Sequence, residues 1–380
     1  MKTFQQRSRF NVLIALLVIL NWGWFTGQSA MALDDRLGMP AMKTDKAHKS
    51  LLTDAAQAGE RLVAVGEQGQ IIFSEDDGHT WTQAQVPVRV NLTAIHFSTP
   101  QKGWVSGHDG VMLHTEDGGK TWQKQLDGAT ASEIVLAAAK RDVERFAAKA
   151  AESRDSEDIA YQLEMANWRL EEAQRDIEIG PSKPIMDIWF KNDQEGFAVG
   201  GFGYFFHTRD GGKTWEDYAT KVDNPDSLHL YAVTGVKNGA IFVVGEEGNI
   251  FRSNDGGDTW QHLESPYTGG LFGVFGTDVD GQVFVFGLKG NTFRSNDLGN
   301  TWQRVAHNVS ASLYGGLSLP DKRLVFVGQN GTLLVCSSNA ESCRVIPRRD
   351  RSILSSVVPT GNGKILVVGM RGLERLGINP

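Results

Sequence analysis

The sequence has few cysteines, no excess of basic charge and no long apolar run beyond its start, and each shortage excludes a class of protein. Two cysteines in 380 residues exclude a disulfide-dense miniprotein and a zinc site built from four cysteines. A formal net charge of −7 argues against a nucleic-acid surface, which usually carries a basic excess. Glycine is abundant instead, at 43 residues. Together with a hydrophobic content of 41%, this describes an ordered, mildly acidic chain with many turns.

The first 32 residues have the three parts of a secretory signal peptide. Lys2, Arg7 and Arg9 precede an apolar run over residues 12–20, and the tripeptide at 30–32 supplies small residues before a cleavage point. The run is short for a membrane span of roughly 20 residues. A lipoprotein is not expected either, because there is no cysteine near the cleavage point. We therefore expect an exported protein in the periplasm, or in a thylakoid lumen-like space if the source is photosynthetic.

One short pattern, Gly-x-x-Gly after a run of β-branched and aromatic residues, recurs seven times. Successive copies start 41 to 45 residues apart, except for one gap of 93 that contains no eighth copy. Each copy predicts two strands joined by a hairpin, and a following octet, S/T-x-D-x-G-x-T-W, predicts a second turn. Four antiparallel strands per repeat predict an all-β, seven-bladed β-propeller. The glycine pairs are Gly66/Gly69, Gly107/Gly110, Gly200/Gly203, Gly245/Gly248, Gly287/Gly290, Gly328/Gly331 and Gly369/Gly372.

The octet, here called the Asp box, indicates a structural turn. Its glycine permits positive φ, its aspartate can accept backbone N–H bonds, and its tryptophan can pack between neighbouring sheets. A catalytic or calcium site needs one constellation of residues, whereas the Asp box is repeated in five blades. We therefore predict structural roles, and no catalytic, metal or cofactor site, for Asp76, Trp81, Asp117, Trp122, Asp210, Trp215, Asp255, Trp260, Asp297 and Trp302.

The last two repeats depart from this pattern. In the sixth, Cys336 and Cys343 stand at the first and last positions of the octet. In an exported protein they are expected to form a disulfide that closes the hairpin, and a redox-active pair is the alternative. The seventh repeat ends soon after Gly372, before a fourth strand. Residues Leu37–Lys49 are therefore predicted to complete the last blade as a clasp.

Residues 129–180 differ from the rest of the chain because they are rich in alanine and glutamate and almost free of glycine. Helical spacing of apolar residues predicts two helices, over 131–151 and 155–179, that form a hairpin between blades two and three. This connection leaves from the face that carries the Gly-x-x-Gly turns, so the hairpin is expected to rise above that face. It is either a docking element, with Trp168 as an anchor if exposed, or a passive lid.

The residues between the paired glycines line the same face and form a mixed, somewhat acidic rim. Propellers usually bind their ligands on this face. The candidate partner-binding residues are Glu67, His108, Asp109, Phe202, Glu246, Glu247, Lys289 and Arg371, with Trp168 on the insert.

The Asp boxes, the V-G-x-x-G runs and the signal peptide together resemble the photosystem II stability/assembly factor family of seven-bladed propellers, over residues 50–128 and 181–380. The resemblance implies a non-enzymatic factor that binds a membrane protein or membrane-protein complex and assists its assembly or stability. It implies no cofactor, no nucleic acid and no small-molecule substrate. A periplasmic accessory of an inner-membrane export system is the alternative among binding proteins. The insert departs from the family pattern.

A sialidase-like glycoside hydrolase is the alternative outside binding proteins, because such enzymes also carry Asp boxes. It would need an arginine triad and a Tyr/Glu pair on the central face. The chain lacks the F/Y-R-I-P strand of those enzymes, and the adjacent Glu246 and Glu247 are expected to point apart. We therefore expect a signal peptide (1–32), a clasp with blades one and two (33–128), a helical insert (129–180) and blades three to seven (181–380).

Overall fold

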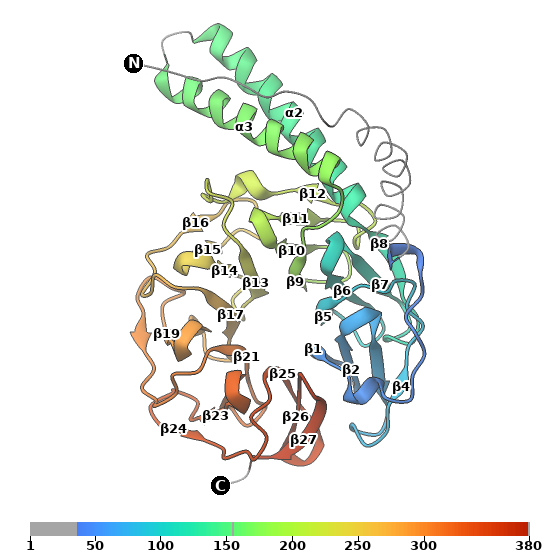
Figure 1. Ribbon diagram of the computed structural model, residues 1–380. Helices are drawn as coiled ribbons and strands as arrows, with labels where there is room; N and C mark the ends of the chain where they lie inside the picture. Colours follow the sequence, from blue (N-terminus) through green and yellow to red (C-terminus); the bar gives the residue numbers. More distant parts are fainter. Residues whose placement is uncertain (1–35, 154–155, 379–380) are drawn as a thin grey trace, which may run out of the picture.

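The computed structural model describes residues 36–153 and 156–378. The signal peptide predicted for residues 1–32 lies outside the described residues. Seven antiparallel sheets surround a central opening (Figure 1), six with four strands and one with three. In each sheet the strands pair in chain order, and the first strand lies at the opening. This arrangement is the predicted all-β propeller.

The strands of the first four sheets are β1 (Leu52–Ala58), β2 (Arg61–Gly66), β3 (Ile71–Ser74), β4 (Thr82–Gln83); β5 (Leu92–Phe97), β6 (Gly103–Gly107), β7 (Met112–Thr115), β8 (Gln123–Leu126); β9 (Ile185–Phe190), β10 (Gly196–Gly200), β11 (Phe205–Thr208), β12 (Glu216–Asp217); β13 (Leu230–Gly235), β14 (Ile241–Gly245), β15 (Ile250–Ser253) and β16 (Gln261–His262). Those of the last three are β17 (Leu271–Gly276), β18 (Val283–Gly287), β19 (Thr292–Ser295), β20 (Gln303–Arg304); β21 (Leu313–Ser318), β22 (Leu324–Gly328), β23 (Leu333–Cys336), β24 (Cys343–Val345); β25 (Leu354–Pro359), β26 (Lys364–Gly369) and β27 (Gly372–Gly377).

The Gly-x-x-Gly turns need both glycines for physical reasons. A Cβ on the first glycine would meet the carbonyl oxygen that precedes the innermost strand, at 2.1 Å for Gly66 and 2.4 Å for Gly245. The second glycine has positive φ, +75° for Gly69 and +80° for Gly248. In six blades the turn is a short 3₁₀ element: η2 (Glu67–Gly69), η3 (His108–Gly110), η4 (Gly201–Gly203), η6 (Glu246–Gly248), η7 (Leu288–Gly290) and η8 (Gln329–Gly331).

The hydrophobic core is divided into seven clusters, one between each pair of neighbouring sheets. The strands of the second position are buried on both faces, which explains their continuous apolar sequence. One cluster joins Leu52 and Ala64 of the first sheet to Leu366 and Val368 of the last, and so closes the ring.

The second residue of every innermost strand is the extra residue of a β-bulge. Its side chain therefore points in a different direction from that of the same residue in a regular strand. In blades seven, one and two it is Ser355, Thr53 or Thr93. Each hydroxyl donates a hydrogen bond of 2.6–2.8 Å to the first carbonyl of the next innermost strand. These bonds tie neighbouring blades together. The bulge residues in chain order are Thr53, Thr93, Met186, Tyr231, Phe272, Tyr314 and Ser355.

Two carboxylates add a second contact between innermost strands. Asp54 Oδ2 accepts the N–H of Ile95, and Asp187 Oδ2 accepts the N–H of Val233, both at 2.9 Å and both in the next blade. Burial raises the pKa of Asp54 to about 6 and the pKa of Asp187 to about 7, although the N–H donors favour the charged form.

The seventh sheet has only three strands among the described residues, so the prediction that Leu37–Lys49 completes it is wrong. The segment instead runs along blade one, where Ala41 N donates to Val86 O at 3.1 Å. Its last residues form the 3₁₀ element η1 (Ala47–Lys49), which contacts β27. Backbone hydrogen bonds along blade one therefore replace the expected strand pairing.

The predicted helical hairpin is confirmed as α2 (Gly128–Glu152) and α3 (Glu157–Ile179), which follow β8 and precede β9. Asp127 caps α2 by accepting from Thr130 N, and Ser156 caps α3 by accepting from Ile159 N. The hairpin begins beside η3, as expected, but it extends outward from the rim and does not cover the central opening (Figure 1). The expectation that it rises above the turn face is therefore wrong.

Asp187 leads to a prediction about the pH dependence of stability. Its folded-state pKa of about 7 exceeds that of an unfolded aspartate, roughly 3.9, so the folded protein holds an extra proton between these values. The contribution of Asp187 to the free energy of unfolding therefore falls as the pH rises from about 4 to about 7. We expect urea unfolding at about pH 5 and about pH 8 to differ less for Asp187→Asn than for the wild type.

Asp255→Asn is the matched control for that experiment. Hydrogen bonds, chiefly from the Thr259 side chain, lower the pKa of Asp255 to about 2, so its contribution is lost only as pH falls below the chosen window. This variant should keep the wild-type difference between the two pH values. An Asp187→Asn protein with unchanged pH dependence would contradict the assignment.

The disulfide between Cys336 and Cys343 closes a loop with a sequence separation of 7. Closing so short a loop contributes about 2 kcal/mol in the chain-entropy account. We expect a Cys336→Ser, Cys343→Ser double variant to lose about that much free energy of unfolding in urea. A reducing agent should destabilise the wild type similarly and leave the double variant unaffected.

Candidate functional site

Each Asp box closes its turn with the same hydrogen bonds. In the first, Asp76 Oδ1 accepts from Ser74 Oγ at 2.7 Å and from Thr80 N at 2.8 Å, and Oδ2 accepts from Thr80 Oγ1 at 2.6 Å. These bonds, chiefly that from the threonine hydroxyl, lower the pKa of Asp76. A carboxylate held in this way is a turn element, and the same contacts recur at Asp117, Asp210, Asp255 and Asp297.

The Asp-box tryptophans pack between blades. Trp260 lies edge-on to Phe197 and Phe205 of the preceding blade, with ring centroids 6.0 and 5.2 Å apart. Its Nε1 donates to a turn carbonyl at 3.0 Å, as do those of Trp81 and Trp122 at 3.2 and 3.0 Å. The buried Nε1 atoms of Trp215 and Trp302 have no hydrogen-bond partner among the described residues.

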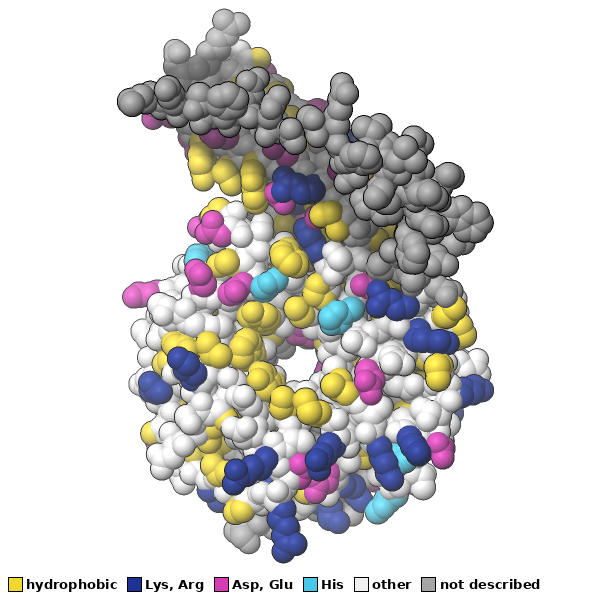
Figure 2. Space-filling model, viewed as in Figure 1, with side chains coloured by type: hydrophobic (Ala, Val, Ile, Leu, Met, Phe, Trp, Pro, Cys, Tyr) yellow, Lys and Arg dark blue, Asp and Glu magenta, His cyan; other side chains and the backbone are white. Residues whose placement is uncertain are grey.

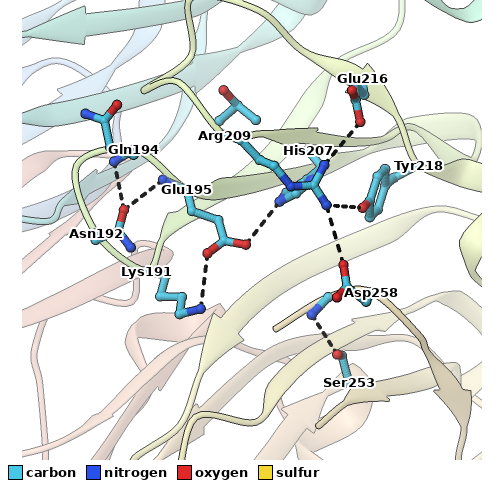
Figure 3. Close-up of polar contacts among 12 residues, drawn as sticks. Lys191, Asn192, Gln194, Glu195, His207, Arg209, Glu216, Tyr218, Ser253 and Asp258 are labelled. Carbon is cyan, nitrogen blue, oxygen red and sulfur yellow. Dashed lines mark hydrogen bonds and ion pairs between the residues drawn. The ribbon is translucent and has the colours of Figure 1, made fainter. Parts of the chain in front are cut away.

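Polar contacts on the Asp-box side join blade three to blade four (Figure 3). Arg209 Nη2 donates to Tyr218 OH at 3.1 Å and lies 3.5 Å from Asp258 Oδ1 in the next Asp box. His207 Nε2 lies 3.5 Å from Glu195 Oε1, and burial lowers the pKa of His207, so the ring is neutral at neutral pH. His207 occupies a repeat position, because Arg252 and Arg294 precede the Asp boxes of later blades. The Arg209–Asp258 contact crosses from blade three to blade four, whereas His207 and Glu195 both belong to blade three.

Within residues 36–153 and 156–378, no group of three His, Cys, Asp or Glu side chains is placed to hold a metal ion. In these two ranges, the search for a helix with the length and apolarity of a membrane span also finds none.

The predicted partner-binding residues of the propeller lie on its turn face, but several are engaged in the fold. Glu67 Oε1 accepts from Leu51 N at 3.0 Å, and Glu246 Oε2 accepts from His229 N at 3.2 Å. Both acids thereby fasten the turn to the residue before the innermost strand. The structure leaves these predicted residues exposed: His108, Phe202, Glu247, Lys289 and Arg371.

Asp109 is buried and lies 3.6 Å from the guanidinium of Arg36. With His108 it borders a polar pocket of about 390 Å³ on the turn face, between blades one and two. The other lining residues are Arg36, Gln68, Arg89, Val90 and Asn91. The pocket therefore brings two predicted residues together with two arginines that the sequence interpretation did not place there.

Trp168 is not brought together with the turn-face residues, because it lies on α3. Its side chain is 43% exposed and borders a shallow groove with Leu163, Glu164 and Glu171. Tyr161, two helical turns earlier on the same side of α3, is 58% exposed.

Ion pairs fix the hairpin to blade three. Arg169 of α3 pairs with Asp217 of β12, whose side chain is only 2% exposed, and lies 3.1 Å from Asp142 of α2. Lys183 pairs with Asp176 at the end of α3, and its ammonium lies 5.6 Å from the ring centroid of Phe202. The base of the hairpin is therefore a fixed extension of the propeller.

The sequence interpretation missed a chain of aromatic rings at the central opening. We call Phe202, His229, Tyr231, Phe272 and Tyr314 the aromatic arc. Consecutive ring centroids are 4.8, 6.1, 5.2 and 5.6 Å apart, across blades three to six. Figure 2 shows hydrophobic side chains gathered along one side of the opening. The signal was present in the sequence, since three of these residues follow the first apolar residue of an innermost strand.

Comparison with known proteins gives the family. A family model described as Photosynthesis system II assembly factor YCF48 matches residues 33–113, 79–139 and 165–268, more than half of the chain. The chain belongs to this family.

Curated YCF48 relatives match a shorter part. The photosystem II assembly protein Ycf48 of Thermosynechococcus vestitus is 34% identical over 71 residues, which are 18% of this chain and 20% of that protein. The photosystem II assembly lipoprotein Ycf48 of Trichormus variabilis is 37% identical over 76 residues, 19% of this chain and 22% of that protein. The chain thus matches about a fifth of the length of these relatives.

Solved YCF48 structures have the same fold. A structure described as YCF48 bound to D1 peptide has a TM-score of 0.59 at 15% identity, covering 90% of this chain and 100% of that one. YCF48 from Cyanidioschyzon merolae has a TM-score of 0.60 at 14% identity, covering 87% and 96%. The WD40 propeller of Doa1 scores 0.59 at 11% identity and covers 90% and 95%. At such identities the likeness shows the propeller fold alone.

The YCF48 family match includes the base of the hairpin but not its far end. It stops at residue 139 in α2 and resumes at residue 165 in α3. Arg169 and Asp217 lie inside the matched segments, whereas Asp142 lies outside them.

Arg169→Ala should destabilise the protein strongly, because it leaves the buried carboxylate of Asp217 without its cation. Burial raises the pKa of Asp217, and the charge of Arg169 opposes that effect. We expect a loss of about 3 kcal/mol in the free energy of unfolding. Arg145→Ala is the control, because this arginine pairs with Asp142 while 54% exposed, and should cost less than about 0.5 kcal/mol. Equal losses in the two variants would contradict the anchoring role.

Proposed function

We propose that this chain is an exported, non-enzymatic propeller that binds protein and assists the assembly or stability of a membrane complex. The match to the YCF48 family over more than half of the chain carries this proposal. Three relatives are named as photosystem II assembly lipoproteins, and a solved neighbour is described as bound to a D1 peptide. By analogy, the partner here is a segment of a membrane protein on the exported side, as in photosystem II.

The geometry of the described residues supports recognition as the mechanism. The Asp-box carboxylates are occupied by hydrogen bonds within their turns. The turn face is rigid, because every blade is tied to its neighbours through buried clusters, and a preorganised face loses little entropy on binding. Its exposed residues include an aromatic ring, two cations and a carboxylate: Phe202, Lys289, Arg371 and Glu247.

We further propose that the hairpin, as an insertion between blades two and three, is a docking element. Trp168 and Tyr161 present exposed aromatic surface on one side of α3, and aromatic residues are favoured anchors at interfaces. The outward direction of the hairpin supports docking over a lid, since a lid must cover the opening (Figure 1). The ion pair of Arg169 with Asp217 would hold the hairpin in place on blade three when a partner binds.

In-cell crosslinking of the tagged full chain, followed by mass spectrometry, tests both proposals. We expect one membrane protein to be recovered with the wild type and at least about tenfold less with Trp168→Ala. Ile179→Ala, at an exposed apolar residue at the base of the hairpin, is the matched control and should recover as much as the wild type.

Two outcomes would contradict these proposals separately. Undiminished recovery by Trp168→Ala, and by a chain in which a short Gly/Ser turn replaces residues 140–164, would show that the hairpin is not the docking element. Failure to recover a membrane protein with any variant, the wild type included, would overturn the assembly function itself.

A further inference from the structure

We propose that the aromatic arc binds an extended peptide segment that carries aromatic or aliphatic side chains beside a lysine or arginine. The inference rests on the proposed function, because it assigns a surface and a partner chemistry to that protein binding. It concerns the side of the central opening formed by blades three to six, away from the polar pocket between blades one and two.

The seven bulge residues differ in size and chemistry from one side of the opening to the other. In blades seven, one and two, small hydroxyl side chains at the bulge tie one innermost strand to the next. In blades four to six the same position holds Tyr231, Phe272 and Tyr314, whose rings contact one another at centroid distances of 5.2 and 5.6 Å. All three rings remain partly exposed at the opening. A bulge that places a large, partly exposed ring at the opening in three successive blades is a binding feature, since serine or threonine serves the fold at the same position elsewhere.

The second argument comes from Phe202 at one end of the arc. It occupies the second position of η4, where φ is +56°. A bulky residue is strongly disfavoured in this left-handed conformation. The other 3₁₀ turns of the face place polar residues there: Gln68, Asp109, Glu247, Lys289 and Asn330. Yet the Phe202 ring is 54% exposed, and its contacts are an edge-on one with His229 and a cation–π contact with Lys183 on a neighbouring loop, so burial in the core does not account for the choice of phenylalanine.

The chemistry of the occupant follows from what surrounds the rings. Apolar faces call for aromatic or aliphatic side chains. Glu246 and Glu247 lie in the turn of blade four beside the arc, and the charge of Glu246, after burial, contributes to raising the pKa of Tyr231. Lys183 at the Phe202 end is already paired with Asp176. A lysine or arginine of the partner would therefore meet unneutralised carboxylates and aromatic faces together.

An extended segment fits better than a helix because of the free hydroxyls. Tyr231 and Tyr314 make their contacts through their rings, and within the described ranges neither hydroxyl has a hydrogen-bond partner. A helix satisfies its own backbone groups, whereas an extended segment offers free N–H and C=O groups to such partners.

Selection of displayed random 12-residue peptides on the immobilised full chain tests the inference. We expect the selected peptides to be enriched in aromatic or aliphatic residues together with lysine or arginine. Their synthetic versions should bind at least about tenfold more weakly to Phe272→Thr and to the Tyr231→Thr, Tyr314→Thr double variant. Threonine is the natural choice here, because the chain itself uses Thr53 and Thr93 at this position, so the fold tolerates it.

Val345→Thr is the matched control, because this valine is 50% exposed on β24 at the outer edge of the propeller and should leave binding unchanged. Changing the basic residue of a selected peptide to glutamate should also abolish binding. Peptides that bind the threonine variants as tightly as the wild type, selected peptides without aromatic or aliphatic residues, or no selected peptide at all would overturn the inference. So would binding of the arc to phospholipid vesicles or to oligosaccharides in place of peptides.

The outcome is separable from that of the proposed function. If peptides bind the arc while crosslinking in cells recovers no membrane protein, the inference stands and the assembly function fails. If the threonine variants recover the membrane protein as well as the wild type does, and peptides ignore the arc, the inference fails and the assembly function stands.

Discussion

The contact between neighbouring innermost strands is the constraint on which the rest of this structure depends. Seven sheets can surround an opening only if each inner strand is held to the next, and no strand pairing crosses between described sheets at this point. The contact is made by the bulge residue and the residue after it. Hydroxyls do this in blades seven, one and two, and Asp54 and Asp187 add carboxylate bonds to backbone N–H groups. The ring closes with the three strands described for the last sheet, because β1 and β25 are joined in the same way through Ser355.

This constraint also explains why the two halves of the opening differ. Where small hydroxyl residues make the contact, the wall of the opening is occupied by the fold. Where aromatic residues replace them, neighbouring rings pack against one another and hold the blades by dispersion, leaving their outer faces in solvent. At equivalent repeat positions, one arc of the ring thus joins its blades through small hydroxyl side chains, and the other joins them through rings that also carry the proposed recognition.

Much of the fold could be read from the sequence because its signals are local and repeated. The paired glycines follow from a carbonyl close to the first and positive φ at the second, and the Asp box is complete within eight residues. Helical periodicity predicted the bounds of both helices to within three residues of those observed. The rest depends on contacts between distant residues. The hairpin points outward because Arg169 meets Asp217, 48 positions later, and no local pattern encodes that pairing. Likewise, Glu67 and Glu246 look like free acids until the loops they fasten are in place.

The anchored hairpin gives the molecule a fixed reach. With 25 residues, α2 is about 38 Å long. Because its base is fixed to blade three, the exposed rings of α3 and those at the opening are held at a separation that neither side can adjust. Under the two proposals above, a partner that engages both must present two segments at that fixed spacing. The protein would then select its partner by the distance between the two segments, which a single binding face cannot do.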